Sequence, residues 1–156
     1  LTRAHAAEWN LDPTRVGVLG FSAGGVTAAL AAVKQGQRLY KLADKTDEVS
    51  CAADFAMLIY SGGTIEKDGS LKAEYSVDKN TPPMFFVHAA DDPVTCLSSV
   101  ALFTALKKSG VSAELHIYSS GGHGYGLRPT EFPVTQWPER AETWLSQMKL
   151  SSAVER

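Results

Sequence analysis

Cysteine is scarce in this chain, since only Cys51 and Cys96 occur among 156 residues. They do not form a C-x-x-C pair and have no companions at zinc-ligand spacing, so the sequence favours two free thiols over a disulfide or a metal site. Long apolar runs are absent as well. None approaches the roughly 20 residues that a membrane-spanning helix needs, and we expect no membrane span.

Clusters of like charge are also missing. The 15 basic and 17 acidic residues are interspersed and give a net charge of −2. This argues against a nucleic-acid partner, because such a partner is bound by clustered Lys and Arg. Residues 1–5 show neither an initiator Met nor a signal-peptide pattern. We therefore expect a chain that starts inside a longer parent sequence or has been processed; its compartment is not indicated.

The residues that are present predict an α/β fold. A hydrophobic content of 44% suffices for a core, and we expect residues 1–156 to form one domain. Mostly apolar strands alternate with helices, as a mostly parallel sheet with helices on both faces requires. We predict strands at 15–21, 53–60, 84–88 and 113–118, and helices at 3–9, 26–33, 97–108 and from Pro138 onward. Ser98 or Ser99 is a candidate helix cap, and the polar segment 62–80 is expected to be a surface excursion or partial lid.

The most informative stretch is Gly20-Phe21-Ser22-Ala23-Gly24, because it joins a predicted strand to a predicted helix. In that setting G-x-S-x-G forms a nucleophile elbow, a strained turn that holds the serine above the sheet edge. We expect the glycines two positions either side, Gly20 and Gly24, to keep strand and helix from colliding. An ordinary glycine-rich turn is the alternative interpretation.

A serine nucleophile needs a base within hydrogen-bond reach and a third group that fixes the tautomer of the base. The stretch His88-Ala89-Ala90-Asp91-Asp92-Pro93-Val94 follows the third predicted strand, and Gly121-Gly122-His123-Gly124-Tyr125-Gly126 follows the fourth. The carboxyl ends of parallel strands meet at one sheet edge. We therefore expect Ser22, one of the two aspartates and His123 to converge there.

These three stretches carry a family resemblance. The order Ser, acid, His with a G-x-S-x-G elbow resembles the α/β-hydrolase fold, and the three motifs together are similar to dienelactone-hydrolase-like and acetylxylan-esterase-like carboxylesterases. The resemblance covers the chain from Asp12 to the last helix. It implies that the acid is Asp92, directly before Pro93, with Asp91 as the alternative.

The chain departs from the resemblance at the oxyanion hole, which needs two donors. The backbone N–H of Ala23 is one candidate, whereas the early loop that normally supplies the second has no match here. Only residues 1–14 precede the first predicted strand. We therefore expect the C-terminal part of an α/β-hydrolase, whose unpaired strand edge is covered by a companion N-terminal fragment or by another copy.

Further side chains near these motifs are weaker candidates. Tyr125, Leu127, Arg128 and Trp137 could line an acyl or sugar pocket, with simple packing as the alternative. We expect no cofactor, and no metal either, because the Asp91-Asp92 pair lacks a third oxygen ligand. The other three histidines fit structural or solvated roles: His88 as a partner of the acid loop, His116 in a partly buried strand and His5 in solvent.

The sequence thus predicts a serine carboxylester hydrolase acting on short acyl esters, with acetylated carbohydrates among the candidate substrates. Lactone hydrolases and peptidases of the same fold use the same residues. A different class of function is a catalytically silent fragment or pseudoenzyme that serves as a binding or assembly module. Retention of all three triad residue types argues against this alternative, whereas the absent oxyanion loop favours it.

Overall fold

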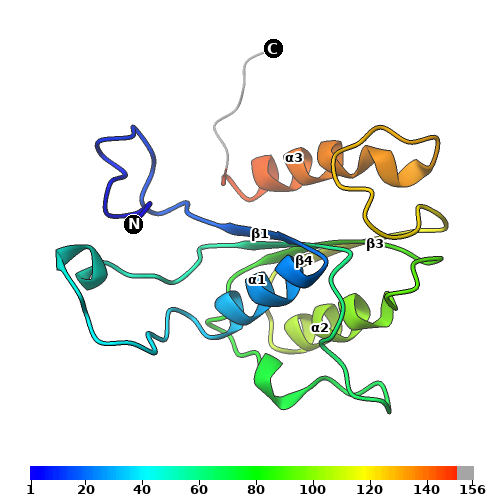
Figure 1. Cartoon of the computed structure of the whole chain (residues 1–156), viewed down its shortest axis with the longest axis horizontal. Helices are drawn as coiled ribbons and strands as arrows, with labels where there is room; N and C mark the ends of the chain where they lie inside the picture. The colour runs from blue at the N-terminus through cyan, green and yellow to red at the C-terminus, as the bar shows by residue number, and fades with distance from the viewer. Residues whose placement is uncertain (151–156) are drawn as a thin grey trace.

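Four parallel strands form a single sheet in the computed structural model, which describes residues 1–150 (Figure 1). The strands lie side by side in chain order as β1 (Val18–Phe21), β2 (Ala56–Ile59), β3 (Met84–Ala89) and β4 (Ala113–Tyr118). In the paired register Phe21 lies opposite Ile59, and Ile59 lies opposite Val87. The carboxyl ends of the strands therefore share one edge of the sheet.

Helices cover both faces of this sheet (Figure 1). The helices α1 (Ala23–Val33) and α2 (Leu97–Lys108) pack on one face, and α3 (Trp137–Gln147) packs on the other. Three short 3₁₀ helices, η1 (Lys45–Glu48), η2 (Ala73–Tyr75) and η3 (Pro133–Gln136), lie in the connections. The predicted α/β class, with a parallel sheet and helices on both faces, is confirmed.

Strand β3 shows why the sequence forms a sheet of this kind. Successive side chains of a strand point to opposite faces, so Met84 and Phe86 join the core beneath α1 and α2. The alternate residues Phe85 and Val87 join the core beneath α3. All four are fully buried, which is the reason that this strand reads as an unbroken apolar run rather than as an alternating one.

Several predicted bounds need correction. Residues 3–9 form successive turns and not a helix, since so short a helix is marginal without a packed face. Helix α1 begins three residues earlier than predicted, directly after Ser22. The predicted serine cap of α2 is wrong, because Cys96 occupies the N-cap without a side-chain hydrogen bond and Ser98 and Ser99 are buried in the first turn. Helix α3 begins at Trp137.

The segment 62–80 is only partly the surface excursion that we expected. Residues 66–70 are exposed, whereas Tyr75 in η2 is buried in the core beneath α1 and α2.

Cys51 and Cys96 are both free, as predicted. No helix within residues 1–150 combines the length and the apolar character needed to cross a bilayer.

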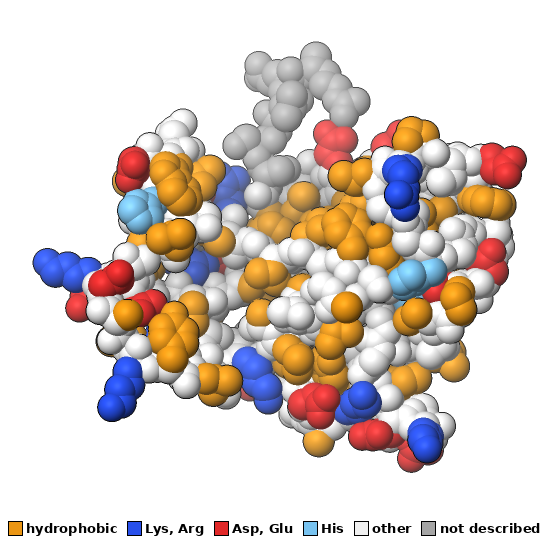
Figure 2. All heavy atoms as spheres, in the orientation of Figure 1, with side chains coloured by type: hydrophobic (Ala, Val, Ile, Leu, Met, Phe, Trp, Pro, Cys, Tyr) orange, Lys and Arg blue, Asp and Glu red, His pale blue; other side chains and the backbone are white. Residues whose placement is uncertain are grey.

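Strand β1 lies at the edge of the sheet that residues 1–150 form, and its partner is β2. Leu19, at its centre, is 47% exposed. Figure 2, seen from the same side as Figure 1, shows apolar side chains at the surface near the middle of the view, where β1 crosses. An edge strand with exposed apolar residues is a template for pairing with another chain segment.

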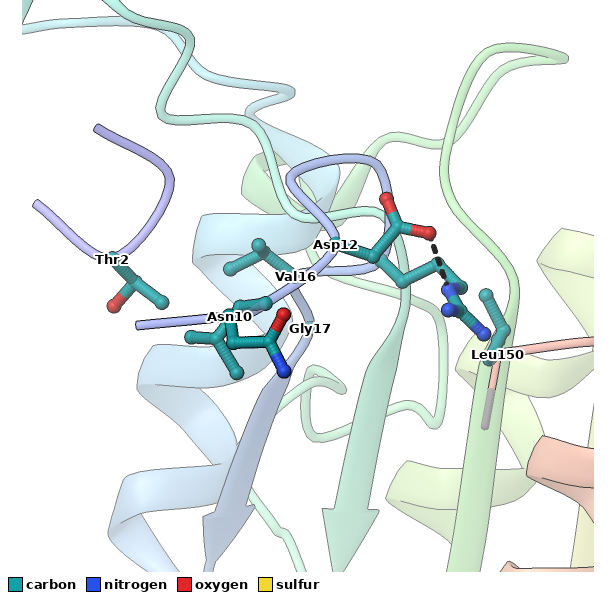
Figure 3. Close-up of a pocket in the computed structure, with 8 residues that line it drawn as sticks. Thr2, Asn10, Asp12, Val16, Gly17 and Leu150 are labelled. Carbon is teal, nitrogen blue, oxygen red and sulfur yellow. Dashed lines mark hydrogen bonds and ion pairs between the residues drawn. The ribbon is translucent and has the colours of Figure 1, made fainter. Parts of the chain in front are cut away.

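A pocket of about 400 Å³ lies where β1 begins (Figure 3). Leu11 and Val16 line it, together with the ion pair between the Arg15 guanidinium and the Asp12 carboxylate, whose Nε to Oδ2 distance is 2.7 Å. Ser22 follows the opposite end of β1. This pocket is therefore separate from the edge of the sheet at which we expect catalysis.

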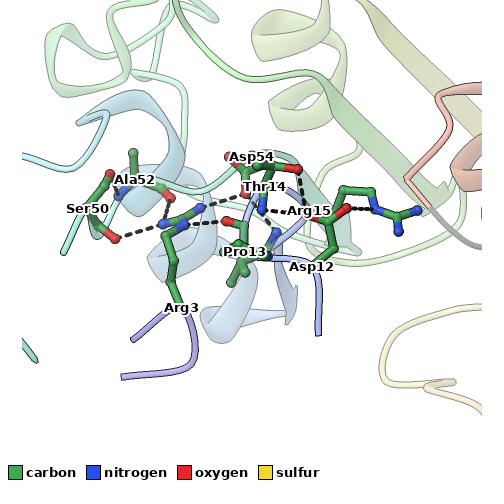
Figure 4. A network of polar contacts seen from close by, with 9 residues as sticks. Arg3, Asp12, Pro13, Thr14, Arg15, Ser50, Ala52 and Asp54 are labelled. Atoms are coloured by element: carbon green, nitrogen blue, oxygen red, sulfur yellow. Dashed lines mark hydrogen bonds and ion pairs between the residues drawn. The ribbon is translucent and has the colours of Figure 1, made fainter. Parts of the chain in front are cut away.

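Arg3 fastens the N-terminal turns to the sheet (Figure 4). Its guanidinium donates to the carbonyl oxygens of Pro13, Ser50 and Ala52 at 2.7, 2.7 and 2.8 Å. It also pairs with the Asp54 carboxylate at 2.6 Å. Three of these four bonds, made by a largely buried side chain, connect the start of the chain to the segment that leads into β2. The bond to Pro13 connects it to the turn before β1.

The glycines of the elbow allow a direct test. A Cβ on Gly20 would lie 2.1 Å from the carbonyl oxygen of Gly24, whereas a Cβ on Gly24 would meet no atom within 4 Å. The expected clearance role of Gly24 is therefore wrong. Gly25 provides the clearance instead, because a Cβ there would lie 2.5 Å from the Cβ of Ser61.

We predict that Gly20→Ala lowers the free energy of unfolding by about 1–3 kcal/mol, the usual cost of overpacking. Gly24→Ala is the matched control and should leave stability unchanged or raise it by up to about 1 kcal/mol, because alanine favours a helix over glycine. Urea unfolding followed by circular dichroism measures both. Equal midpoints for the two variants would contradict the steric role assigned to Gly20.

Candidate active site

Ser22 occupies a strained turn between β1 and α1. Its backbone has φ 52° and ψ −120°, a left-handed conformation that costs a non-glycine residue about 1–3 kcal/mol unless the surroundings enforce it. The Ser22 N–H donates to the Ile59 carbonyl at 3.0 Å, and the Ser22 carbonyl accepts from the N–H of Gly25 at 2.9 Å. The turn is thus held by β2 on one side and by α1 on the other.

A continuous hydrogen-bond chain joins the three predicted triad residues. The Ser22 Oγ lies 2.8 Å from Nε2 of His123. The Nδ1 of the same ring lies 2.8 and 3.0 Å from the two carboxylate oxygens of Asp92. An ionised carboxylate only accepts, so Nδ1 donates to Asp92 and Nε2 is left to accept the hydroxyl proton of Ser22.

Asp92 is buried and further fixed by its own loop. One of its oxygens accepts the N–H of Val94 at 2.7 Å, and His88 Nε2 lies 3.4 Å from the other. His88 itself donates to the Val94 carbonyl at 2.8 Å and bonds the Ser99 hydroxyl through Nδ1 at 2.9 Å. Burial holds the pKa of His88 below its usual value, which keeps the ring neutral beside the carboxylate. Its predicted role as a partner of the acid loop is confirmed.

The neighbouring Asp91 has different partners. Its carboxylate accepts the N–H of Gly122 at 2.8 Å and that of Gly121 at 3.3 Å. The first of these bonds is the main reason that the pKa of Asp91 lies below its usual value. Of the two aspartates, Asp92 is therefore the one bonded to the imidazole, while Asp91 bonds the backbone of the histidine loop.

The histidine loop follows β4 and owes its path to glycine. Gly122 and Gly124, on either side of His123, have φ 61° and 79°, values that L-residues with a side chain adopt rarely. This path carries His123 from the end of β4 across β3 and β2 to Ser22, which follows β1.

The four pocket candidates divide into two pairs. Tyr125 and Trp137 are buried, and the indole N–H of Trp137 donates to the Gly126 carbonyl at 2.8 Å, which favours the packing alternative for both. Leu127, which is 68% exposed, and Arg128 lie at the surface next in the chain. Arg128 donates to the carbonyl of Gly124, the residue after His123.

Ala23 is the first residue of α1 and is exposed. The first N–H groups of a helix have no carbonyl partner within the helix, and the helix dipole favours negative charge at this end. The Ala23 N–H is thus available beside the Ser22 hydroxyl. Within residues 1–150, no three His, Cys, Asp or Glu side chains lie close enough together to hold a metal ion.

Sequence reasoning missed Tyr60, which directly follows β2. Its ring centroid lies 4.9 Å from that of His123 at an interplanar angle of 67°. Tyr60 was predicted only as the end of a strand. The available signal was an aromatic residue before the Ser61-Gly62-Gly63 turn, at the same sheet edge as the serine elbow.

The two remaining histidines lie outside this site. His116 on β4 is partly buried, as predicted, and bonds the Glu114 carboxylate at 2.7 Å. His5 bonds Glu8 at 2.9 Å and stacks on Trp9 with a centroid distance of 5.2 Å.

Fold and site geometry together define an α/β-hydrolase. A deep-sea metagenome α/β hydrolase, MGS-M1, superposes with a TM-score of 0.72 at 24% identity over 94% of this chain and 59% of that one. The sequence pattern of the prolyl oligopeptidase family matches residues 1–149. The chain belongs to this family.

Two similar proteins are named for hydrolysis of acetyl esters. An acetylxylan esterase from Xylanibacter ruminicola is 28% identical over 143 residues, which cover 81% of this chain and 29% of that protein. The crystal structure of an acetyl ester-xyloside bifunctional hydrolase from Caldicellulosiruptor lactoaceticus has a TM-score of 0.84 at 31% identity and covers 97% of this chain and 63% of that one. The chain thus spans less than two thirds of the length of either relative. The predicted resemblance to acetylxylan-esterase-like α/β-hydrolases is confirmed, and the prolyl oligopeptidase family is the assignment that sequence reasoning did not name.

Proposed function

We propose that this chain carries the catalytic triad of a serine ester hydrolase that acts on short acyl esters, acetylated carbohydrates included. The observation that carries the proposal is the unbroken hydrogen-bond chain from Ser22 through His123 to the buried Asp92. The similarity to an acetylxylan esterase and to an acetyl ester-xyloside bifunctional hydrolase supports the choice of substrate class.

In the proposed reaction Ser22 Oγ attacks the ester carbonyl while His123 Nε2 takes the hydroxyl proton. The Asp92 carboxylate stabilises the imidazolium that forms, and the Ala23 N–H donates to the oxyanion. His123 then protonates the leaving alcohol, which departs from the acyl-enzyme. In the second half His123 deprotonates a water molecule that attacks the acyl carbon. The bond from that carbon to Ser22 Oγ then breaks, His123 returns the proton to Oγ, and the carboxylic acid leaves.

Three alternatives that the sequence names are retained. Peptide hydrolysis uses the same three residues and is favoured by the family to which the chain belongs; lactone hydrolysis uses them as well. A silent binding or assembly module is favoured by the single oxyanion donor that we assign. The Oγ to Nε2 distance of 2.8 Å favours an active hydrolase, because a serine that lacks a bonded base is a poor nucleophile.

The proposal predicts that a fluorophosphonate probe labels Ser22. An activated serine reacts because His123 accepts its proton, so the adduct mapped by mass spectrometry should lie on Ser22 and disappear in Ser22→Ala. An adduct on another residue would contradict the assignment. So would a sample that hydrolyses p-nitrophenyl acetate without any labelling.

The two neighbouring aspartates form a matched pair. Asp92→Asn should lower kcat by about 10⁴, because an amide in place of the orienting carboxylate favours the wrong histidine tautomer. Asp91→Asn should cost far less, since Asp91 bonds only the backbone of the loop. Steady-state kinetics on p-nitrophenyl acetate, with circular dichroism to check folding, decides between them. A larger loss for Asp91→Asn would reverse the assignment.

We also propose that the open edge of β1 pairs with a companion N-terminal segment or with a second copy of the chain. The support is the position of β1 at the sheet edge and the exposure of Leu19. Such a segment would run beside Ser22, where the second oxyanion donor is needed.

Sedimentation tests this proposal. A specific interface should bury at least about 1,000 Å², so the chain should sediment as a complex or bind a separately supplied N-terminal segment of its relatives' fold. Leu19→Lys should weaken that association, whereas Leu39→Lys, a control at a 94% exposed leucine outside the sheet, should not. A monodisperse 16.7 kDa monomer with full esterase activity would refute the proposal.

A further inference from the structure

Tyr60 has an unusual backbone conformation at the catalytic edge of the sheet. Its φ is 40°, in the left-handed region where a bulky L-residue is strained by about 1–3 kcal/mol. Ile59 pairs with Phe21 across β1 and β2, so Tyr60 and Ser22 follow neighbouring strands at matching positions. Both of these residues are left-handed, and strain of this kind concentrates where function requires a fixed geometry.

The surroundings of Tyr60 enforce this conformation. Its N–H donates to the Val87 carbonyl at 2.7 Å, which ties it to β3. Its side chain is only 5% exposed, and its ring contacts those of Tyr125 and Phe21 at centroid distances of 4.5 and 5.8 Å. The phenol ring is therefore held on several sides before it meets His123.

The contact between Tyr60 and His123 supplies a restraint that the other contacts of His123 lack. Hydrogen bonds to Asp92 and Ser22 act at the two ring nitrogens, so tilting of the ring about the line that joins them is restrained only by its bond to Cβ. The flanking residues of His123 are glycines and present no side chain to brace it. An edge-to-face ring contact at 4.9 Å and 67° is a favourable geometry for two aromatic rings and limits that tilt.

We propose that Tyr60 is a positioning residue that sets the tilt of the His123 imidazole through its ring. This inference rests on the proposed function, in which His123 exchanges a proton with Ser22. Burial raises the pKa of Tyr60, so the phenol is neutral at ordinary pH and contributes no charge. Phenylalanine keeps the ring and should therefore preserve its contact with His123.

Steady-state kinetics on p-nitrophenyl acetate tests the role of the ring. Tyr60→Leu should lower kcat by about 10- to 100-fold with KM nearly unchanged, because a small misplacement of a catalytic group has effects of that size. Tyr60→Phe should stay within about threefold of the parent kcat, since it keeps the ring. Phe86→Leu is the control, because it removes a fully buried aromatic from the core beneath α1 and α2 and should lower stability without changing kcat.

An NMR measurement separates this inference from the proposed function, because it needs no turnover. The ¹⁵N shifts of the His123 ring should indicate a single tautomer protonated at Nδ1 in the parent chain and in Tyr60→Phe, and an averaged state in Tyr60→Leu. If the parent chain hydrolyses no ester, the proposed function fails while this measurement still decides the role of Tyr60.

Three results would overturn the inference: an unchanged kcat and tautomer in Tyr60→Leu, an equal loss in Tyr60→Phe, or an equal loss of kcat in Phe86→Leu.

Discussion

Parallel pairing of the four strands is the constraint on which the rest of the structure depends. Because β1, β2, β3 and β4 run the same way and pair in register, each chain segment that leaves a strand does so at the same edge. Ser22, Tyr60, Asp92 and His123 all lie in such segments, one after each strand. Residues separated by up to 101 positions are thereby brought within hydrogen-bond distance.

Burial then assigns different roles to chemically similar residues. His88 and His123 both contact Asp92, but His88 is enclosed, neutral and bonded to its own loop. The side chain of His123 is 29% exposed and retains a nitrogen directed at Ser22. The two aspartates differ in the same way, since Asp92 is buried and accepts from His123 Nδ1 while Asp91 is exposed and bonds the loop backbone.

The sequence was sufficient for those parts of the structure that depend on local patterns. The apolar run of β3 marks a buried strand, and the glycine turn at Ser22 and the glycine-rich loop around His123 each follow the end of a strand. Together these patterns predict the fold and the convergence of three side chains. The remaining features depend on tertiary contacts, which local sequence patterns do not reveal. That Gly25 and not Gly24 faces a neighbouring side chain depends on where Ser61 lies, and Ser99 bonds His88 instead of capping α2. Tyr125 and Trp137 pack inward for reasons that no local pattern contains.

The strain at the catalytic edge is the clearest link between the core and the site. Ser22 and Tyr60 both adopt left-handed backbone conformations, and each is held by one hydrogen bond to the next strand, at Ile59 and Val87. Those acceptor residues are fully buried, so a shift of either would disturb packing on the α3 face of the sheet. The apolar core beneath α3 therefore stabilises the fold and also maintains the two strained turns at Ser22 and Tyr60. In this sense the hydrogen-bonded arrangement of Ser22, His123 and Asp92 depends on how tightly β2 and β3 are buried.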